Sequence, residues 1–194
     1  MTALAVSNVV LWVLVLVLAA VVLALTRQLG VIHQRIAPAG ALMLNRGLTV
    51  GEAAPVLELA ALDGRSLRVG IARDDGRSTL LLFVSPSCPV CKSLLPAVKS
   101  SRRDERSWMD VILASDGDTA EQREFVRVQG LEDIPYVVSA ALGLAYQVSR
   151  LPFAALLDER GVLRARGLVN SREHLESLFE ARRLGVASLQ EYFS

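Results

Sequence analysis

The sequence is nearly free of net charge and has few histidines and cysteines. Its 21 Lys and Arg residues almost balance 20 Asp and Glu, leaving a formal charge of +1, so no basic excess would attract a nucleic acid. The two histidines, His33 and His174, do not form a spaced pair. With only two cysteines in the chain, they do not make the four-ligand pattern of a structural zinc site. We therefore predict no metal and no nucleic-acid partner.

Charged residues are absent from residues 1–26. The run Leu4–Leu25 is apolar except for Ser7 and Asn8, and at about 1.5 Å per residue such a helix crosses a hydrocarbon core of about 30 Å. A cleaved signal peptide, the alternative, has a basic start and an apolar stretch of about 7–15 residues. We predict an uncleaved transmembrane anchor at residues 1–26, helical over about 4–25, then a juxtamembrane linker at 27–50.

The charges after the anchor do not alone decide its orientation. Arg27, Arg35 and Arg46 precede the first acid, Glu52, and positive flanking charge favours the cytoplasmic side. Long domains, however, often translocate whatever their flanking charge, and the thiol chemistry described below suits an oxidising compartment. We therefore predict that the globular domain lies on the outer side of the membrane.

Residues 51–184 follow the strand and helix pattern of an α/β sandwich, and 185–194 form a tail. Asp63-Gly64 is a strong hairpin signal, and Thr79–Val84 is a short apolar run typical of a strand buried on both faces. The last helix is predicted to begin at Asn170, a cap reciprocated by Glu173. The other predicted elements are strands at 56–59, 66–69, 110–114, 153–157 and 162–167, helices at 88–101 and 119–128, and a short strand with a helical turn within 136–146.

Cys88 and Cys91 stand three residues apart where the strand Thr79–Val84 gives way to a helix. Residues one helical turn apart face the same way, so their sulfurs can bond or separate with little backbone motion. The free N–H groups and partial positive charge of a helix amino terminus stabilise a thiolate, which is the nucleophilic form of cysteine. We predict that Cys88 attacks, that Cys91 resolves the mixed disulfide, and that Pro89 takes the first helical position.

Other interpretations of the pair stay open. The pair could be buried and inert, although a loop–helix corner is a poor place to bury two thiols. It could be half of a zinc site that lacks further ligands. A peroxide-reducing cysteine would have a Ser or Thr three residues earlier, where Ser85 stands, but a second cysteine one turn later fits that chemistry poorly. In each case Pro96 lies inside the helix and predicts a kink, because it cannot bond the Lys92 carbonyl.

A second element should dock the partner beside this pair. Thiol-exchange proteins bind the partner backbone next to a cis-proline loop, and Leu151-Pro152 directly precedes the predicted strand at 153–157. Pro135 is the alternative, and either could be an ordinary trans proline at a strand edge. We favour Pro152 because a hairpin and the last helix follow it directly.

These residues resemble the thioredoxin superfamily over about residues 51–184. The matching features are the buried strand before Cys-x-x-Cys, Pro96 five residues after the second cysteine, Pro152 before a hairpin, and the closing helix. Gly51–Pro55 with Leu62-Asp63-Gly64 resembles the amino-terminal hairpin of the peroxiredoxin/TlpA-like branch. Two positions depart from typical thioredoxin: Ser87 replaces Trp before the first cysteine, and Leu82 replaces a buried acid that relays protons. A general reductase is therefore less well matched than a dedicated exchange partner.

A closer resemblance runs nearly end to end, to the methylamine utilisation family MauD. It covers the anchor, Ser85–Cys91 with Ser87, Pro89 and Val90 around the cysteines, Leu151–Ala154, the tail residues Gly185–Tyr192, and above all the more specific segment Gly167–Glu176. The resemblance implies a role in maturing the methylamine dehydrogenase small subunit, a periplasmic polypeptide dense in disulfides that carries tryptophan tryptophylquinone. It maps the family's redox pair onto Cys88 and Cys91, with no cofactor besides that disulfide.

The resemblance leads us to expect a thiol–disulfide oxidoreductase or isomerase of the inner (cytoplasmic) membrane, with a single span and its domain in the periplasm. Its expected partners are the small subunit as client, a membrane thiol-redox protein that recycles the pair, and the bilayer itself. Two alternatives are a non-catalytic escort that holds the unfolded client, and a reductant for apocytochrome thiols in cytochrome c maturation. The sequence does not distinguish oxidase, reductase and isomerase, because the reduction potential depends on small differences in thiolate stabilisation.

Overall fold

The structure is a computed structural model that describes residues 2–33 and 48–184. Most of the predicted linker (34–47) and the tail (185–194) lie outside the described residues. The chain divides into two units, Met1–Asn45 and Arg46–Ser194. In the first unit, helix α1 (Thr2–His33) spans the predicted helix at 4–25 and continues into the segment predicted as the linker. In the described parts of the chain, no helix is both long enough and apolar enough to cross a membrane.

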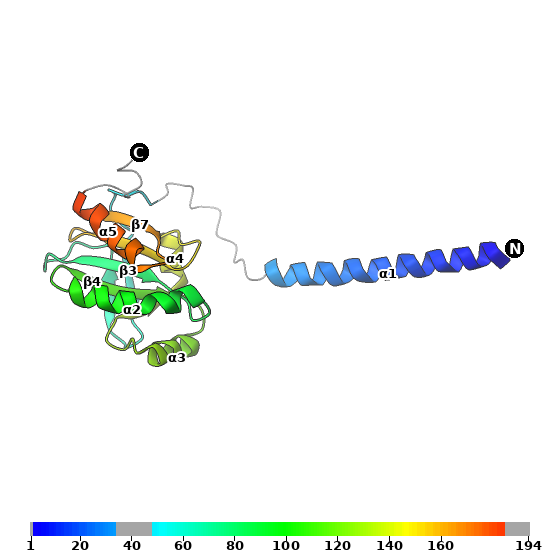
Figure 1. The fold of residues 1–194 in the computed structure, drawn as a ribbon, viewed down its shortest axis with the longest axis horizontal. Coiled ribbons are helices and arrows are strands. Elements are labelled where there is room, and N and C mark those ends of the chain that lie inside the picture. The colour runs from blue at the N-terminus through cyan, green and yellow to red at the C-terminus, as the bar shows by residue number, and fades with distance from the viewer. Residues whose placement is uncertain (1, 34–47, 185–194) are drawn as a thin grey trace. The chain divides into compact units, whose positions relative to one another are not determined.

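The second unit is built on a five-stranded sheet of order β5-β4-β3-β6-β7 (Figure 1). Its strands are β3 (Ser78–Phe83), β4 (Met109–Ser115), β5 (Tyr136–Val138), β6 (Phe153–Leu157) and β7 (Leu163–Leu168). The pairs β3–β4 and β4–β5 are parallel, whereas β3–β6 and β6–β7 are antiparallel. Every residue of the central strand β3 is buried, as the apolar run predicts. The carboxyl ends of β3, β4 and β5 therefore meet at one edge of the sheet.

A separate hairpin precedes this sheet and confirms the prediction at Asp63-Gly64. It pairs β1 (Leu57–Ala60) with β2 (Ser66–Val69) in antiparallel register. Gly64 takes a left-handed φ of 86° in the turn, which only glycine adopts without cost. Isolated bridges join Ala61 to Val137 and Ala53 to Val162, so the hairpin segment is bonded near both outer strands of the sheet.

Three helices cover one face of the sheet, a fourth helix and the hairpin cover the other, and the two faces form two cores. The helices are α2 (Pro89–Asp104), α3 (Thr119–Gln129), α4 (Ala140–Ala145) and α5 (Arg172–Leu184). Leu80 and Leu82 point into the core formed with α2, α3 and α5. Leu81 and Phe83 alternate with them and point into the core formed with α4 and the hairpin. Cys91 belongs to the first core, so its side chain is buried in the layer that α2, α3 and α5 form with the sheet.

Helix α3 begins at a well-formed cap, and this gives a stability prediction. The Asp118 carboxylate accepts hydrogen bonds from the backbone N–H groups of Ala120 (2.9 Å) and Glu121 (3.0 Å). Replacing Asp118 by Ala leaves these donors without a protein partner, so we expect the free energy of unfolding to fall by about 1 kcal/mol. Urea unfolding followed by circular dichroism of the full-length protein measures this change. Asp118→Asn is the control and should retain most of the stability; an equal loss in both variants would contradict the capping role.

The start of α5 differs from the prediction. The helix begins at Arg172, and Ser171 acts as the cap, its Oγ accepting from the His174 N–H at 3.4 Å. The Asn170 backbone N–H donates to His174 Nδ1 at 3.2 Å, so the predicted Asn170–Glu173 capping pair is wrong. Ser171 has the same capping chemistry as Asn170, and a hydrogen bond from Ser171 also lowers the pKa of Glu173.

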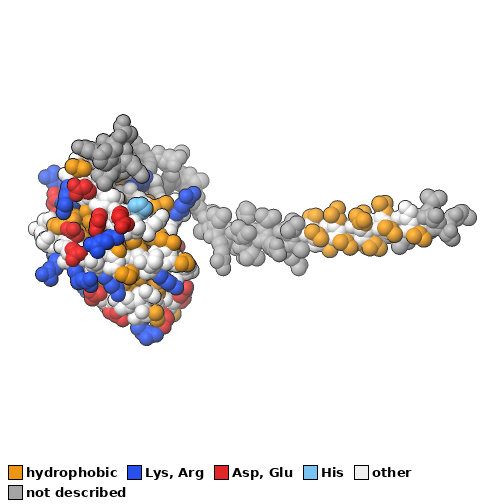
Figure 2. All heavy atoms as spheres, in the orientation of Figure 1, with side chains coloured by type: hydrophobic (Ala, Val, Ile, Leu, Met, Phe, Trp, Pro, Cys, Tyr) orange, Lys and Arg blue, Asp and Glu red, His pale blue; other side chains and the backbone are white. Residues whose placement is uncertain are grey.

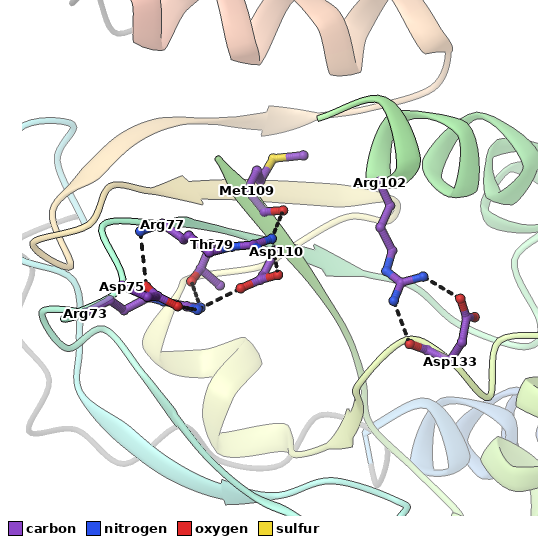
Figure 3. A network of polar contacts seen from close by, with 8 residues as sticks. All are labelled: Arg73, Asp75, Arg77, Thr79, Arg102, Met109, Asp110 and Asp133. Atoms are coloured by element: carbon purple, nitrogen blue, oxygen red, sulfur yellow. Dashed lines mark hydrogen bonds and ion pairs between the residues drawn. The ribbon is translucent and has the colours of Figure 1, made fainter. Parts of the chain in front are cut away.

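A charged network holds the sheet edge opposite to the cysteines (Figure 3). Arg73 and Arg77, both from the loop before β3, converge on Asp110 of β4 at N–O distances of 2.7 and 2.6 Å. Arg77 also donates to the Met109 carbonyl at 2.9 Å. Asp75 bonds Arg73, which lowers the pKa of its carboxyl to about 2. This network fixes where the parallel strands β3 and β4 begin and contains no cysteine.

The visible face of this unit mixes both signs of charge (Figure 2). Arg102 of α2 pairs with the Asp133 carboxylate and donates to its carbonyl at 2.8 Å, which ties α2 to the loop before β5 (Figure 3). Figure 2 shows blue and red side chains interspersed over the visible face, with no large area of one sign.

Candidate active site

The cysteine pair sits where β3 ends and α2 begins. The Val84 N–H bonds the Ala114 carbonyl at 2.9 Å, which extends the β3–β4 pairing to the edge of the sheet. The chain then turns, with the Cys88 N–H donating to the Ser85 carbonyl at 3.1 Å. Cys88 is the N-cap of α2, with extended backbone angles, and Pro89 takes the first helical position as predicted. The sequence thus places Cys88 at the amino terminus of a 16-residue helix.

The two sulfurs have different surroundings. Cys88 is partly exposed, whereas Cys91 has no exposed surface, and both are free thiols in this structure. The Cys91 backbone N–H donates to Cys88 Sγ at 3.1 Å, and the Lys92 N–H bonds the Cys88 carbonyl at 3.2 Å. The donor is one of the backbone N–H groups at the amino end of the helix that have no partner within the helix itself. The geometry therefore assigns the accessible position to Cys88 and the inner position to Cys91.

Burial makes Cys91 a poor acid. Burial raises the pKa of the Cys91 thiol to about 12, and the contact with Cys88 adds to the rise, while the Ser85 backbone N–H opposes it. Leu82 lies in the same core cluster, fully buried, at the position where a relay acid was noted to be missing. Cys91 is therefore a neutral thiol at physiological pH in this dithiol form.

The Leu151–Pro152 loop lies at the same edge as the cysteines. Its peptide bond is cis, as predicted, and no other cis bond occurs in residues 2–33 and 48–184, so the alternative at Pro135 is wrong. Pro152 is buried and its carbonyl accepts from the Val169 N–H at 3.1 Å. Because Phe153 pairs with Phe83 at the end of β3, Pro152 stands next to the turn that leads to Cys88.

Three exposed apolar residues come from the elements at this edge. Val90, Leu151 and Leu168 are large apolar residues that are 42%, 37% and 44% exposed. Val90 lies between the cysteines, Leu151 lies in the cis-proline loop, and Leu168 pairs in register with Phe153. Exposed apolar side chains beside a reactive group are typical of a docking surface. Leu168 is not predicted from the sequence, because its position next to the loop depends on the β6–β7 register.

Ser85, the residue on which the peroxide alternative depends, is hydrogen-bonded to Ser87. The Ser85 hydroxyl lies 2.9 Å from the Ser87 hydroxyl and accepts from the Ser87 N–H at 3.3 Å, so it is engaged by Ser87.

Pro96 lies inside α2, which continues to Asp104. In the part of the chain that the structure describes, no group of three or more His, Cys, Asp or Glu side chains could hold a metal ion.

Two buried polar residues near this edge are not predicted from the sequence. The Tyr136 hydroxyl donates to Gln122 Oε1 at 2.6 Å, and both side chains are almost fully buried. They come from β5 and α3 and lie in the helix-covered layer that also holds Cys91. The sequence signal for this pair is Gln122, a glutamine on the buried face of an otherwise amphipathic helix, because a buried amide requires a hydrogen-bond partner.

A parallel-centred sheet, a Cys-x-x-Cys at a helix amino terminus and a cis-proline before the next strand define the thioredoxin-like fold. DsbF from MTB has this fold: it aligns with a TM-score of 0.58 at 20% identity, covering 69% of this chain and 99% of that one. No protein-family model matches the chain.

Curated relatives are far more similar. The methylamine utilization protein MauD of Methylobacillus flagellatus is 49% identical over 186 residues, which cover 96% of this chain and 90% of the relative. The protein of the same name from Paracoccus denitrificans is 47% identical over 188 residues, covering 97% and 93%. The chain therefore belongs to the methylamine utilization protein MauD family, as the resemblance noted in the sequence indicated.

Proposed function

We propose that this protein is a thiol–disulfide oxidoreductase or isomerase that assists disulfide formation in the methylamine dehydrogenase small subunit during methylamine metabolism. One observation carries the proposal: Cys88 is partly exposed and its sulfur accepts the Cys91 N–H at a helix amino terminus, while Cys91 is buried. The two cysteines therefore differ in access, as a nucleophile and a resolving thiol must. Membership in the MauD family supports the link to methylamine metabolism.

The exchange proceeds through a mixed disulfide. In the reducing direction, the Cys88 thiolate attacks one sulfur of a client disulfide, forms a new S–S bond, and releases the other client sulfur as a thiolate that takes up a proton. The Cys91 sulfur then attacks Cys88, and the second client sulfur leaves. Run in reverse, the same steps transfer the Cys88–Cys91 disulfide to the client. The client disulfide is isomerised when, after the first step, a client thiolate attacks the mixed disulfide again and releases Cys88.

The client is proposed to dock on the Leu151–Pro152 loop. This loop adjoins the end of β3, and its Leu151 side chain is exposed together with Val90 and Leu168. An extended segment of the unfolded client could cover these three side chains and bring one of its sulfurs to Cys88. Ser87, Pro89 and Pro96 support the site by shaping the turn and the helix that hold Cys88.

Recycling and location complete the proposal. A single Cys-x-x-Cys pair stops after one exchange, so a membrane thiol-redox partner is proposed to restore it. Residues 4–25 are proposed to anchor the protein in the inner membrane with the 51–184 domain in the periplasm, because this segment lacks charge. The described side chains of α1 are exposed, and apart from Ser7 and Asn8 they are apolar on all sides.

Client maturation separates exchange from a non-catalytic escort. A methylamine-utilising host that lacks its own family member is supplied with the wild-type chain or with the double variant Cys88→Ser/Cys91→Ser. We expect the double variant to leave the small subunit with free thiols and the dehydrogenase activity at background, measured by thiol labelling and enzyme assay. The exposed variant Ser93→Ala, on the same helix, should mature the client normally. Full maturation by the double variant would contradict exchange and indicate an escort; a loss confined to c-type cytochromes would indicate the apocytochrome reductant.

A further inference from the structure

Ser85 takes no chemical part in thiol exchange, yet it stands three residues before Cys88 at the end of the central strand. It follows Val84, which is 1% exposed and whose N–H bonds the Ala114 carbonyl at 2.9 Å. Ser85 itself is half-buried, and the chain leaves the sheet at this residue and turns toward Cys88. Ser85 therefore joins the rigid sheet to the turn that carries the accessible sulfur.

Two prolines restrict most of the backbone of this turn. Pro86 lies inside the turn and Pro89 takes the first helical position, and each proline ring fixes its own φ. A residue that precedes a proline is restricted to extended backbone, and Cys88 accordingly has a φ of −92° and a ψ of 109°. Ser87 is neither a proline nor followed by one, so its backbone torsions are the least restricted of the turn.

Ser85 supplies the hydrogen bonds that limit this remaining freedom. Its Oγ accepts the Ser87 N–H at 3.3 Å and lies 2.9 Å from the Ser87 Oγ. A serine hydroxyl that bonds the backbone two residues further on mimics a backbone turn. The Ser85 carbonyl accepts the Cys88 N–H at 3.1 Å and closes a β-turn, in which serine is favoured at the first position and proline at the second. Both backbone N–H groups between Pro86 and Pro89 therefore bond to Ser85.

The same residue also contacts the second cysteine. Burial raises the pKa of the Cys91 thiol, and a hydrogen bond from the Ser85 backbone N–H to this thiol partly opposes the rise. The Cys91 N–H in turn donates to the Cys88 Sγ at 3.1 Å. Ser85 thus holds the segment that carries Cys88 through its carbonyl and side chain, and it contacts Cys91 through its N–H. These bonds restrain the position of one sulfur relative to the other.

We propose that Ser85 is a positioning residue that sets the effective concentration of the Cys91 sulfur at Cys88. The proposal rests on the proposed function and concerns its second step. In that step the Cys91 sulfur bonds to the Cys88 sulfur, the bond between Cys88 and the client sulfur breaks, and water carries the Cys91 proton to the departing client thiolate. Holding two reacting groups in line accelerates such an intramolecular attack. The Ser85 hydroxyl acts through the turn and not on the reacting sulfurs.

The first test separates the two thiol steps in the reduced full-length protein in detergent. With one equivalent of 5,5′-dithiobis(2-nitrobenzoate), Cys88 attacks and releases one coloured thiolate, and Cys91 then resolves the adduct and releases a second. We expect Ser85→Ala to slow the second, intramolecular phase at least about fivefold, while the first, bimolecular phase keeps its rate. Ser85→Thr retains the hydroxyl and should restore most of the rate of the second phase.

Equilibrium with a glutathione buffer gives a second readout, which a loss of overall stability alone would not change. A lower effective concentration destabilises the Cys88–Cys91 disulfide relative to the dithiol. The reduction potential of Ser85→Ala should therefore become less negative, by about 30 mV for a tenfold loss of effective concentration. Acid quenching, thiol labelling and mass spectrometry of the full-length protein give the fraction of each form.

Ser93→Ala is the matched control. Its hydroxyl donates to the Val90 carbonyl at 2.9 Å, so this variant also loses one serine hydrogen bond close to the pair. Both phases and the reduction potential should keep their wild-type values. A second phase that is unaltered in Ser85→Ala, or slowed as much in Ser93→Ala or Ser85→Thr, overturns the positioning role. Absence of the first phase in the wild-type protein would instead contradict the proposed exchange chemistry.

Discussion

Replacing Cys91 by Ser should trap the client on Cys88 as a stable mixed disulfide, whereas replacing Cys88 by Ser should abolish adduct formation. Cys88 is accessible and accepts a helix-terminal N–H, so it can attack. Cys91 has no exposed surface and cannot meet a client sulfur directly. Without Cys91 the first exchange still occurs, but the sulfur that would release the client is missing. We expect the adduct to change from a transient species to the main product, while exchange by Cys88→Ser falls to background.

The adduct is measured by non-reducing electrophoresis and mass spectrometry of the full-length variants incubated with a disulfide-containing client segment. Ser93→Ala is the control, since its hydroxyl bonds the Val90 carbonyl on the outside of α2 and touches neither sulfur. It should exchange as the wild-type protein does. Equal adduct yields from Cys88→Ser and Cys91→Ser would show that the two sulfurs are interchangeable and would contradict the assigned roles.

The placement of the cysteines was predictable because local sequence rules determine it. The apolar run before Ser85 predicts a buried strand, and Pro89 fits the first turn of a helix, so Cys88 had to lie at the junction. The hairpin at Asp63-Gly64 follows from turn chemistry in the same way. Pro152 was a weaker inference, since a proline before a strand can be cis or trans.

Features that depend on long-range register were not predictable. Tyr136 reaches the helix-covered core only because β5 pairs with β4, and this pairing joins segments that a helix separates. The partnership of Gln122 with Tyr136 follows from that register. The error at α5 has a local cause instead: Asn170 and Ser171 are adjacent residues of similar capping strength, and contacts of His174 decide between them.

Leu82 connects these observations to the chemistry. An apolar residue there leaves Cys91 in a dry core, so its charged form is disfavoured and its proton is held tightly. A protein with these properties should resolve a mixed disulfide slowly unless another group moves the proton. Slow resolution lengthens the life of the mixed disulfide, which suits a protein dedicated to one client with many disulfides better than a general reductase.

Because Cys91 is buried, we expect its alkylation to be much slower in the folded protein than in the unfolded chain, by a factor that depends on pH. The ordinary pKa of a cysteine thiol is 9.0, and burial raises the pKa of the Cys91 thiol to about 12. At pH 8 the thiolate fraction is then about one in ten thousand in the folded protein and about one in ten in the unfolded chain, and the thiolate is the reactive form. We therefore expect iodoacetamide to modify Cys91 at least about a thousandfold more slowly in the folded protein than in urea, while Cys88 reacts readily in both.

The pH series makes this prediction specific to ionisation. Raising the pH from 8 to 10 brings the unfolded thiol close to full ionisation, whereas the folded Cys91 thiolate still increases about tenfold per pH unit. The ratio between unfolded and folded rates should therefore narrow to about one hundred at pH 10. Peptide mass spectrometry of the full-length protein after timed alkylation identifies which sulfur was modified. Comparable rates at Cys88 and Cys91 in the folded protein at pH 8 would show that Cys91 is neither buried nor protonated, and the division of labour between the two sulfurs would have to be abandoned.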